Sequence, residues 1–312
     1  MPRTIRVTVG DVTASSTRAD LVAGVDEPNA SNTGVLAGTT LTTLTGNQTI
    51  TTAGTVIQDK DIFGKVNIQA ANVVIKNCRI RGANDGAFAI VQCTSTACVN
   101  AQIIDCDIVA DFPTDTLNGI YGHDFTALRC NIRDTVDCIR VNNTSVPTAA
   151  TGVTVQQCYL HHMAVRSPTA TQSDNVTHND CVQIESGSGL VMLGNSVHAE
   201  SGSATASDAG GLAFTPWPTC CLMVTPNVGA ISAMDIQKNW IYGGRIAVNA
   251  GADSLSTSNL GKIWQNRFDR SQYYAGHTID IQAGTTWDAG EGTGNQNVYM
   301  DNGAPVTVRR NA

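Results

Sequence analysis

Apolar and polar residues alternate in short segments that recur along most of the chain. β-Branched residues dominate these segments, and each ends in a Cys or Asn, one spacer and an apolar residue. Such alternation predicts β-strands. The copies of this first phrase are Val73–Ile80, Ile103–Ile108, Ala127–Ile132, Val153–Leu160, Val191–Val197, Met234–Ile241 and Lys262–Phe268. Their anchor residues recur 24 to 44 positions apart, which is typical of a solenoid: Cys78, Cys106, Cys130, Cys158, Asn195, Asn239 and Asn266.

A second apolar phrase lies between successive copies of the first. Its copies begin at Gly86, Asn118, Asp137, Asp180, Cys220, Gly244 and His277. Two strand phrases in strict alternation predict the coils of an all-β fold, a single-stranded right-handed parallel β-helix. Because such coils stack about 4.8 Å apart, the anchor residues should form one inward column. A buried Asn is tolerated there when its amide bonds to its neighbours in the column.

The phrases divide the chain into a short leading segment and one long domain. Residues 1–34 are predicted to be an N-terminal strand followed by a linker or attachment segment, and residues 35–312 form the β-helix with its capping ends. Two insertions, Met163–Asn179 and Glu200–Thr219, leave the helix at the same corner in successive coils. We therefore expect them to wall a cleft.

Composition removes several classes of function. The net charge of −7 and the lack of a basic stripe argue against nucleic acid. No apolar run is long enough to insert into a membrane, and the first residues lack the apolar core of a signal peptide. The ten Cys are expected to be mainly buried, with Cys93 and Cys98 the best-placed pair for a disulfide. No CxxC zinc pattern is present, so neither a metal nor another cofactor is predicted.

Two carboxylates mark the most promising place for chemistry. Asp137 and Asp180 open the second phrase in adjacent coils, with Asn118 one coil earlier. Carboxylates one coil apart suit the separation of about 5–5.5 Å used by retaining glycosidases. Crowding would make the pair share one proton, and His161 is the third candidate acid–base group. The competing interpretation, which we favour, is that these residues only cap turns.

Polar and aromatic side chains near this corner are candidates for contact with a glycan. Some are expected to point outward from the second phrase, others from the end of the first, and two lie in the insertions. The candidates are Tyr121, His123, Arg133, Arg140, His178, Gln183, Glu185, His198, Trp217 and Tyr242. Trp217 and Trp240 could equally lie in a subunit interface.

The segments Ser31–Gly82 and Thr177–Ile184 (THNDCVQI) resemble a group of actinobacterial and actinophage right-handed parallel β-helix proteins of the pectate-lyase-like fold. The resemblance covers most of residues 31–300. It implies a phage tail appendage or minor tail protein that recognises a bacterial surface polysaccharide, forms trimers and contacts other virion proteins. The absence of a signal peptide fits a virion protein assembled in the host cytoplasm.

The chain lacks the motifs of the best-known enzymes of that fold. Neither the calcium-binding Asp cluster with an Arg base of pectate lyases nor the polygalacturonase set NTD, DD, GHG and RIK is present. No catalytic residue can therefore be transferred by motif. The alternatives to recognition alone are a glycoside hydrolase or polysaccharide lyase acting on envelope glycan, and a purely structural virion component.

Overall fold

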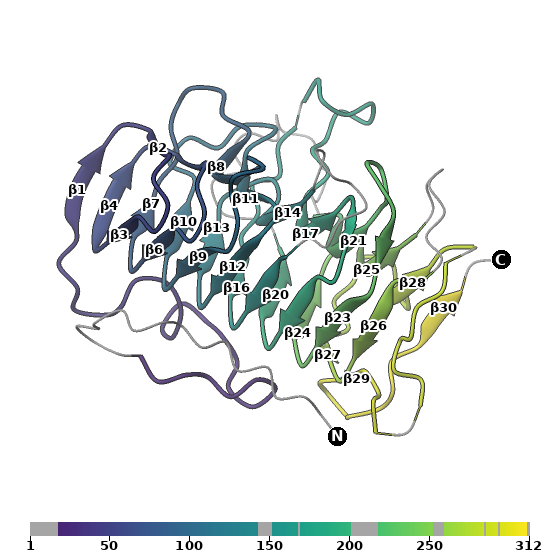
Figure 1. Ribbon diagram of the computed structural model, residues 1–312. Helices are drawn as coiled ribbons and strands as arrows, with labels where there is room; N and C mark the ends of the chain where they lie inside the picture. Colours follow the sequence, from purple (N-terminus) through teal and green to yellow (C-terminus); the bar gives the residue numbers. More distant parts are fainter. Residues whose placement is uncertain are drawn as a thin grey trace.

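The chain folds into a parallel β-helix, as the recurring phrases predict. The computed structural model describes residues 18–142, 152–167, 169–200, 218–251, 259–283, 285–292 and 294–310. Within these ranges the regular structure is β-strand, and no helix has both the length and the apolar character needed to cross a bilayer. Successive coils stack along one axis from β1 to β30 (Figure 1). Every pairing between named strands is parallel, and the strands form three long sheets and one short one.

Each of the long sheets takes one strand from a coil. Sheet A contains β1 (Thr42–Thr45), β4 (Lys60–Phe63), β7 (Arg79–Ile80), β10 (Asp107–Val109), β13 (Asn131–Arg133), β16 (Tyr159–Leu160), β20 (Ser196–Ala199), β24 (Trp240–Gly243), β27 (Arg267–Phe268) and β29 (Val298–Tyr299). Sheet B contains β2 (Gln48–Ile50), β5 (Val66–Ile68), β8 (Ala89–Cys93), β11 (Asn118–Gly122), β14 (Ile139–Val141), β17 (Asp180–Ile184), β21 (Cys220–Val224), β25 (Ile246–Ala250), β28 (Ile279–Ile281) and β30 (Val308–Arg310).

Sheet C contains β3 (Val56–Gln58), β6 (Val74–Lys76), β9 (Ala101–Ile104), β12 (Phe125–Leu128), β15 (Thr154–Gln156), β19 (Val191–Leu193), β23 (Met234–Gln237) and β26 (Gly261–Trp264). The short sheet pairs β18 (Gly187–Ser188) with β22 (Ile231–Ser232). The predicted second phrase corresponds to sheet B. The first phrase is not one strand but two, one in sheet C and one in sheet A.

A left-handed residue divides the first phrase at the corner between sheets C and A. The residue before each anchor has positive φ, for example 52° at Asn77, 53° at Asp105 and 58° at Lys238. A single residue with left-handed backbone angles interrupts the extended chain, so the strand bends sharply at this position. The apolar alternation shifts at the bend: Ile75 and Cys78 both belong to the core, with two residues between them where strict alternation would place one. The sequence pattern therefore held a sign of the bend, which the expectation of a single strand overlooked.

The anchor residues form the predicted inward column. All four Cys anchors and all three Asn anchors are completely buried. The amide of Asn195 donates to Asn239 Oδ1 at 2.8 Å, and that of Asn239 donates to Asn266 Oδ1 at 2.8 Å. Asn297, which the sequence did not place in the column, accepts the next bond from Asn266 at 2.9 Å. The Asn half of the column is thus hydrogen-bonded as expected.

The ten Cys are buried and free. Cys93 and Cys98 are therefore not bridged, although their spacing made them the best-placed pair. Their thiols are hydrogen-bonded to each other instead, and this contact, with burial, raises the pKa of Cys93. Both side chains belong to the apolar core, where Cys behaves as a small hydrophobic residue.

The N-terminal segment packs along the corner between sheets C and A. Arg129 donates to Asp20 Oδ1 at 2.8 Å, and the amide of Leu36 donates to Asn77 Oδ1 at 2.8 Å. This segment, coloured purple, runs beside the coil stack in Figure 1. The strand predicted in residues 1–12 lies outside the described residues. The Thr-rich coils expected between residues 39 and 70 are present as β1 to β5.

Candidate functional site

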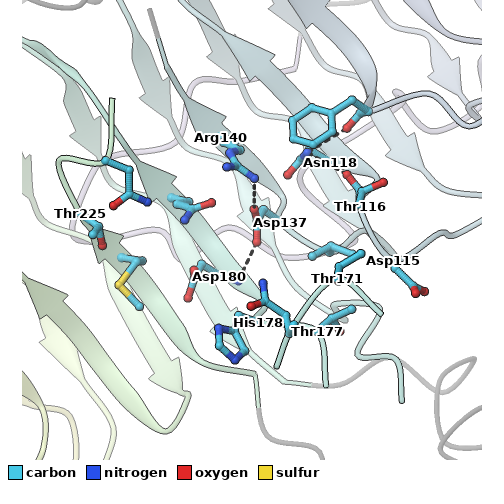
Figure 2. A pocket seen from close by; sticks show the side chains of 16 residues that line it. Asp115, Thr116, Asn118, Asp137, Arg140, Thr171, Thr177, His178, Asp180 and Thr225 are labelled. Carbon is cyan, nitrogen blue, oxygen red and sulfur yellow. Dashed lines mark hydrogen bonds and ion pairs between the residues drawn. The ribbon is translucent and has the colours of Figure 1, made fainter. Parts of the chain in front are cut away.

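A polar groove lies on the outer face of sheet B, with a cavity of about 400 Å³. Its floor comes from the starts and outward faces of strands β11, β14, β17 and β21, and loops from the corner with sheet A form its rim. Figure 2 shows the side chains that line the groove and the strands and loops that carry them. The lining residues are Phe88, Asp115, Thr116, Asn118, Val136, Asp137, Arg140, Thr171, Gln172, Thr177, His178, Asp180, Gln183, Met223, Thr225 and Asn227.

The predicted column of Asn118, Asp137 and Asp180 forms part of this floor. The register pairs Ile120 with Ile139 and Ile139 with Val182, so the three polar residues lie at equivalent places in successive coils. Asp137 Oδ1 accepts the backbone N–H of Asp180 at 2.9 Å. The backbone N–H of Cys220 bonds in the same way to the carboxyl of Asp180. Each Asp therefore caps the next coil, which agrees with the turn interpretation.

Burial also gives this pair acid–base capacity. Asp137 and Asp180 are 1% and 2% exposed. Loss of solvent raises the pKa of Asp137 to about 7, although the bond from Asp180 N–H and the charge of Arg140 oppose the shift. Burial, reinforced by the neighbouring Asp137, raises the pKa of Asp180 well above its usual value. Because like charges so close cannot both ionise cheaply, the pair retains a proton near neutral pH.

Arg140 is held at the centre of the groove by a buried carboxylate. Its Nε and Nη2 donate to the two oxygens of Glu185 at 2.9 and 2.6 Å, and Asn142 donates to the same carboxylate at 2.7 Å. The guanidinium also lies 5.2 Å from the centre of the Phe88 ring. Bidentate ion pairs of this kind fix the orientation of Arg. The third Arg140 nitrogen, Nη1, lies 3.9 Å from Asp137 Oδ2.

The outward positions on sheet B divide into two groups. Tyr121, Arg140 and Gln183 form one outward column in register, as predicted. His123 and Glu185, also predicted to point outward, are buried, at 4% and 3% exposed. Each directly follows a strand, and its polar group bonds to a neighbour: Glu185 accepts from Arg140 of the outward column. His123 Nδ1 lies 2.8 Å from Asp124 Oδ2.

The first predicted insertion does wall the groove. Thr171, Gln172, Thr177 and His178 line its edge, and His178 Nε2 lies 3.0 Å from Asp174 Oδ2. The second insertion, including Trp217, falls almost entirely in residues 201–217, outside the described part of the chain. The loop from β10 to β11 supplies Asp115 and Thr116, which the sequence gave no reason to choose. Met223 could have been found, because it continues the Gln183 column.

The histidine column lies on sheet A and does not reach the groove. His198 pairs with Tyr242 in register, and His161 follows Leu160, which pairs with Val197. His161 stacks on Tyr159 with ring centres 3.8 Å apart, and burial lowers the pKa of His161 to about 2. Neither this column nor Arg133 is among the groove-lining residues. The expectation that His161 joins Asp137 and Asp180 at one corner is therefore wrong, since they belong to different sheets.

Other contacts occupy the remaining sheet A candidates. Tyr242 donates its hydroxyl to Glu27 Oε1 at 2.7 Å, so the N-terminal segment covers it. Trp240, predicted to be outward, is only 6% exposed, and the Arg267 guanidinium lies 5.2 Å from its ring centre. Arg133 pairs with Asp134 beside it.

Comparison with known proteins leaves the geometry of the groove as the main guide to function. The chain matches no protein-family model, and no curated protein matches it significantly.

Proposed function

We propose that the protein binds a bacterial cell-surface polysaccharide in the sheet B groove, as a phage tail appendage. The observation that carries the binding proposal is the groove itself, whose polar floor holds Arg140 between two buried acids. The tail assignment rests on the resemblance of Ser31–Gly82 and Thr177–Ile184 to β-helix appendages. Trimer formation, contacts with other virion proteins and location in the tail are parts of the same proposal.

The chemistry of the lining suits sugars. Hydroxyl groups of a sugar both donate and accept hydrogen bonds, and the groove offers donors at Arg140 and Gln183 and acceptors along the floor. Asn118 Oδ1 and Asp180 Oδ1 also lack a hydrogen-bond partner in the protein, but both atoms are buried from solvent and are not counted among the acceptors that a sugar reaches. The Phe88 ring adds an apolar face of the kind on which ligands with mixed surfaces rest.

Binding of envelope polysaccharides to the full chain tests this proposal, on a glycan array and then by titration. Gln183→Ala and His178→Ala should each weaken the Kd for the bound glycan by about tenfold, the effect of losing about 1.4 kcal/mol. Gln92→Ala is the matched control, because Gln92 occupies the same outward column three coils earlier and lies outside the groove. Absence of binding to any envelope polysaccharide, or equal effects of Gln183→Ala and Gln92→Ala, would contradict the proposal.

A second candidate function is cleavage of the bound glycan. What favours it is the pair of buried carboxyl groups, Asp137 and Asp180, at the floor of the groove, because burial raises the pKa of both. The protonated carboxyl, which we assign to Asp180, would donate its proton to the glycosidic oxygen as the bond to that oxygen breaks. Asp137, closer to Arg140, would be the ionised partner that attacks or stabilises the sugar.

Hydrolysis would release new reducing ends from envelope polysaccharide, whereas a lyase would release unsaturated uronates that absorb in the ultraviolet. If the protein is a hydrolase, Asp137→Asn and Asp180→Asn should each reduce the rate at least about 100-fold, with glycan binding retained. A wild-type protein that binds the glycan and releases neither product is a recognition protein alone.

A further inference from the structure

Three potential metal ligands converge at the corner of sheet A, away from the groove. They are His161, His162 and Glu200, and their ligand atoms all lie within 4.8 Å of one another. Nδ1 of His161 contacts Nδ1 of His162, and Nδ1 of His162 lies 3.3 Å from Glu200 Oε1. Two rings and a carboxylate thus direct electron pairs at one small volume.

The backbone brings these residues together from two successive coils. Successive residues of a strand point to opposite faces, so His161 and His162 would diverge if β16 continued. Instead His162 has φ of 50°, which ends the alternation and turns its ring toward that of His161. Glu200 comes directly after β20 in the next coil, and its carbonyl accepts the N–H of Met163 at 2.9 Å.

A hydrogen-bond chain fixes which nitrogen of His161 carries the proton. Asn131 donates its amide to Asp107 Oδ1 at 3.1 Å, so Asn131 Oδ1 faces the ring of His161. His161 Nε2 lies 2.7 Å from that oxygen and must therefore be the protonated nitrogen. Nδ1 is left with its lone pair pointing to His162 and Glu200. Metal-binding His residues are typically held in this way, with the second nitrogen donating to a carbonyl or carboxylate.

We propose that His161, His162 and Glu200 bind a divalent transition-metal ion of the Zn²⁺ type. Two His and one Glu make a known donor set for zinc, with a water in the fourth position. Ligand bonds of about 2.0–2.1 Å in a tetrahedron place ligand atoms about 3.3 Å apart, the separation found between His162 Nδ1 and Glu200 Oε1. The Nδ1 atoms of His161 and His162 are in closer contact, so one ring would rotate away as the ion enters between them. The His162 and Glu200 side chains are 44% and 47% exposed, so solvent can reach the open position.

The ion would tie two coils together at the base of both insertions. His162 precedes the Met163–Asn179 loop, which carries Thr177 and His178 to the groove. Glu200 immediately precedes residues 201–217. The sequence did not predict this site, because its three donors come from a corner of one coil and the strand end of the next.

Calorimetric titration of the chelator-treated full chain with Zn²⁺ tests the site, with Co²⁺ absorption as an independent readout. We expect one saturable site per chain. His162→Asn, which keeps a residue tolerant of positive φ, and Glu200→Gln should each raise the Kd at least tenfold. Asn131→Ala should raise it about 10–100-fold, the usual effect of losing a partner of a ligating His.

His178→Asn is the matched control, because His178 also pairs with a carboxylate and is 44% exposed. It should leave the Kd unchanged, and circular dichroism should show that every variant is folded. Lack of saturable Zn²⁺ and Co²⁺ binding by the wild type would show that the cluster is only a hydrogen-bonded group. Equal effects of His162→Asn and His178→Asn would place the ion elsewhere and overturn the proposal.

Discussion

The outer faces of sheets A and B both carry columns of side chains, but the face of sheet A is covered and part of the face of sheet B is open. Each presents outward side chains in register along the helix axis. On sheet A these side chains are bonded within the chain, since Glu27 accepts from Tyr242 and from Ser196 at 3.1 Å, and Arg267 donates to the carbonyl of Gly24. On sheet B the outward column borders an open groove.

Buried oxygens without a hydrogen-bond partner in the protein occur in both regions. Among the described residues, Asn118 Oδ1 and Asp180 Oδ1 lie at the groove, whereas Thr135 Oγ1 follows a strand of sheet A and Gln157 Oε1 lies at the corner between sheets C and A. What separates the two faces is therefore the cover over sheet A and the open groove on sheet B. A column of polar residues is thus a guide to a binding site only when the rest of the fold does not cover it.

The largest difference in the free energy of unfolding should appear when one arginine on each face is replaced by alanine. Arg140→Ala on sheet B would leave Glu185, 4% exposed at its side chain, without its cation, and should lower the free energy of unfolding by about 3–5 kcal/mol. Arg133→Ala on sheet A removes a 43% exposed side chain and should cost less than about 1 kcal/mol. Denaturant titration measures both, and equal losses would show that the Arg140–Glu185 pair does not behave as a buried ion pair.

The next largest effect is expected in the pH dependence of stability, from Asp137 beside sheet B. Burial raises the pKa of Asp137 from 3.8 to about 7, so between these values the folded protein holds a proton that the unfolded chain has released. This contribution is complete at low pH and is lost as the pH rises toward 7, at a cost of up to about 4 kcal/mol. Asp137→Asn keeps an oxygen for the Asp180 N–H and should remove that slope.

Thermal unfolding of wild type and Asp137→Asn from pH 4 to 8 provides the measurement, and the difference between the two curves isolates Asp137 from other titrating groups. Parallel curves would show that Asp137 is ionised throughout this range and that burial does not raise its pKa.

A smaller difference in stability is expected between Tyr→Phe substitutions on the two faces. Tyr242→Phe removes the hydrogen bond to Glu27 and should cost about 1 kcal/mol, with faster hydrogen exchange in residues 18–36. Tyr121→Phe, in the outward column of sheet B, should change stability by less than about 0.5 kcal/mol. If Tyr242→Phe leaves exchange unchanged, Glu27 does not hold the segment on sheet A.

The smallest effect on stability is expected at Gln183. This residue faces the groove from the outward column, and Gln183→Ala should change the free energy of unfolding by less than about 0.5 kcal/mol. Because the same variant should weaken glycan binding about tenfold, the two measurements together separate function from structure. A loss of stability above about 1 kcal/mol would mean that Gln183 supports the fold instead.

The sequence by itself determined the repeat, the strand type and the inward column. Anchor residues such as Cys106 and Asn239 are read directly from alternation and spacing, because a solenoid converts position in the repeat into position in space. The same logic placed Asp137 beside Asp180 and Gln183 beside Arg140. These relations depend only on register, which the apolar pattern fixes.

Only the tertiary structure decided which polar columns are open and which distant groups meet. In the coil of the candidate histidine, the bend at Gln157 places His161 at the end of a sheet A strand, so its side chain lies on a different face of the helix from the carboxyl pair of sheet B. Glu27 covers Tyr242 from more than two hundred residues away, and Glu200 joins His161 and His162 across coils. Such contacts depend on the paths of loops and on burial, which are properties of the whole fold and not of any single repeat.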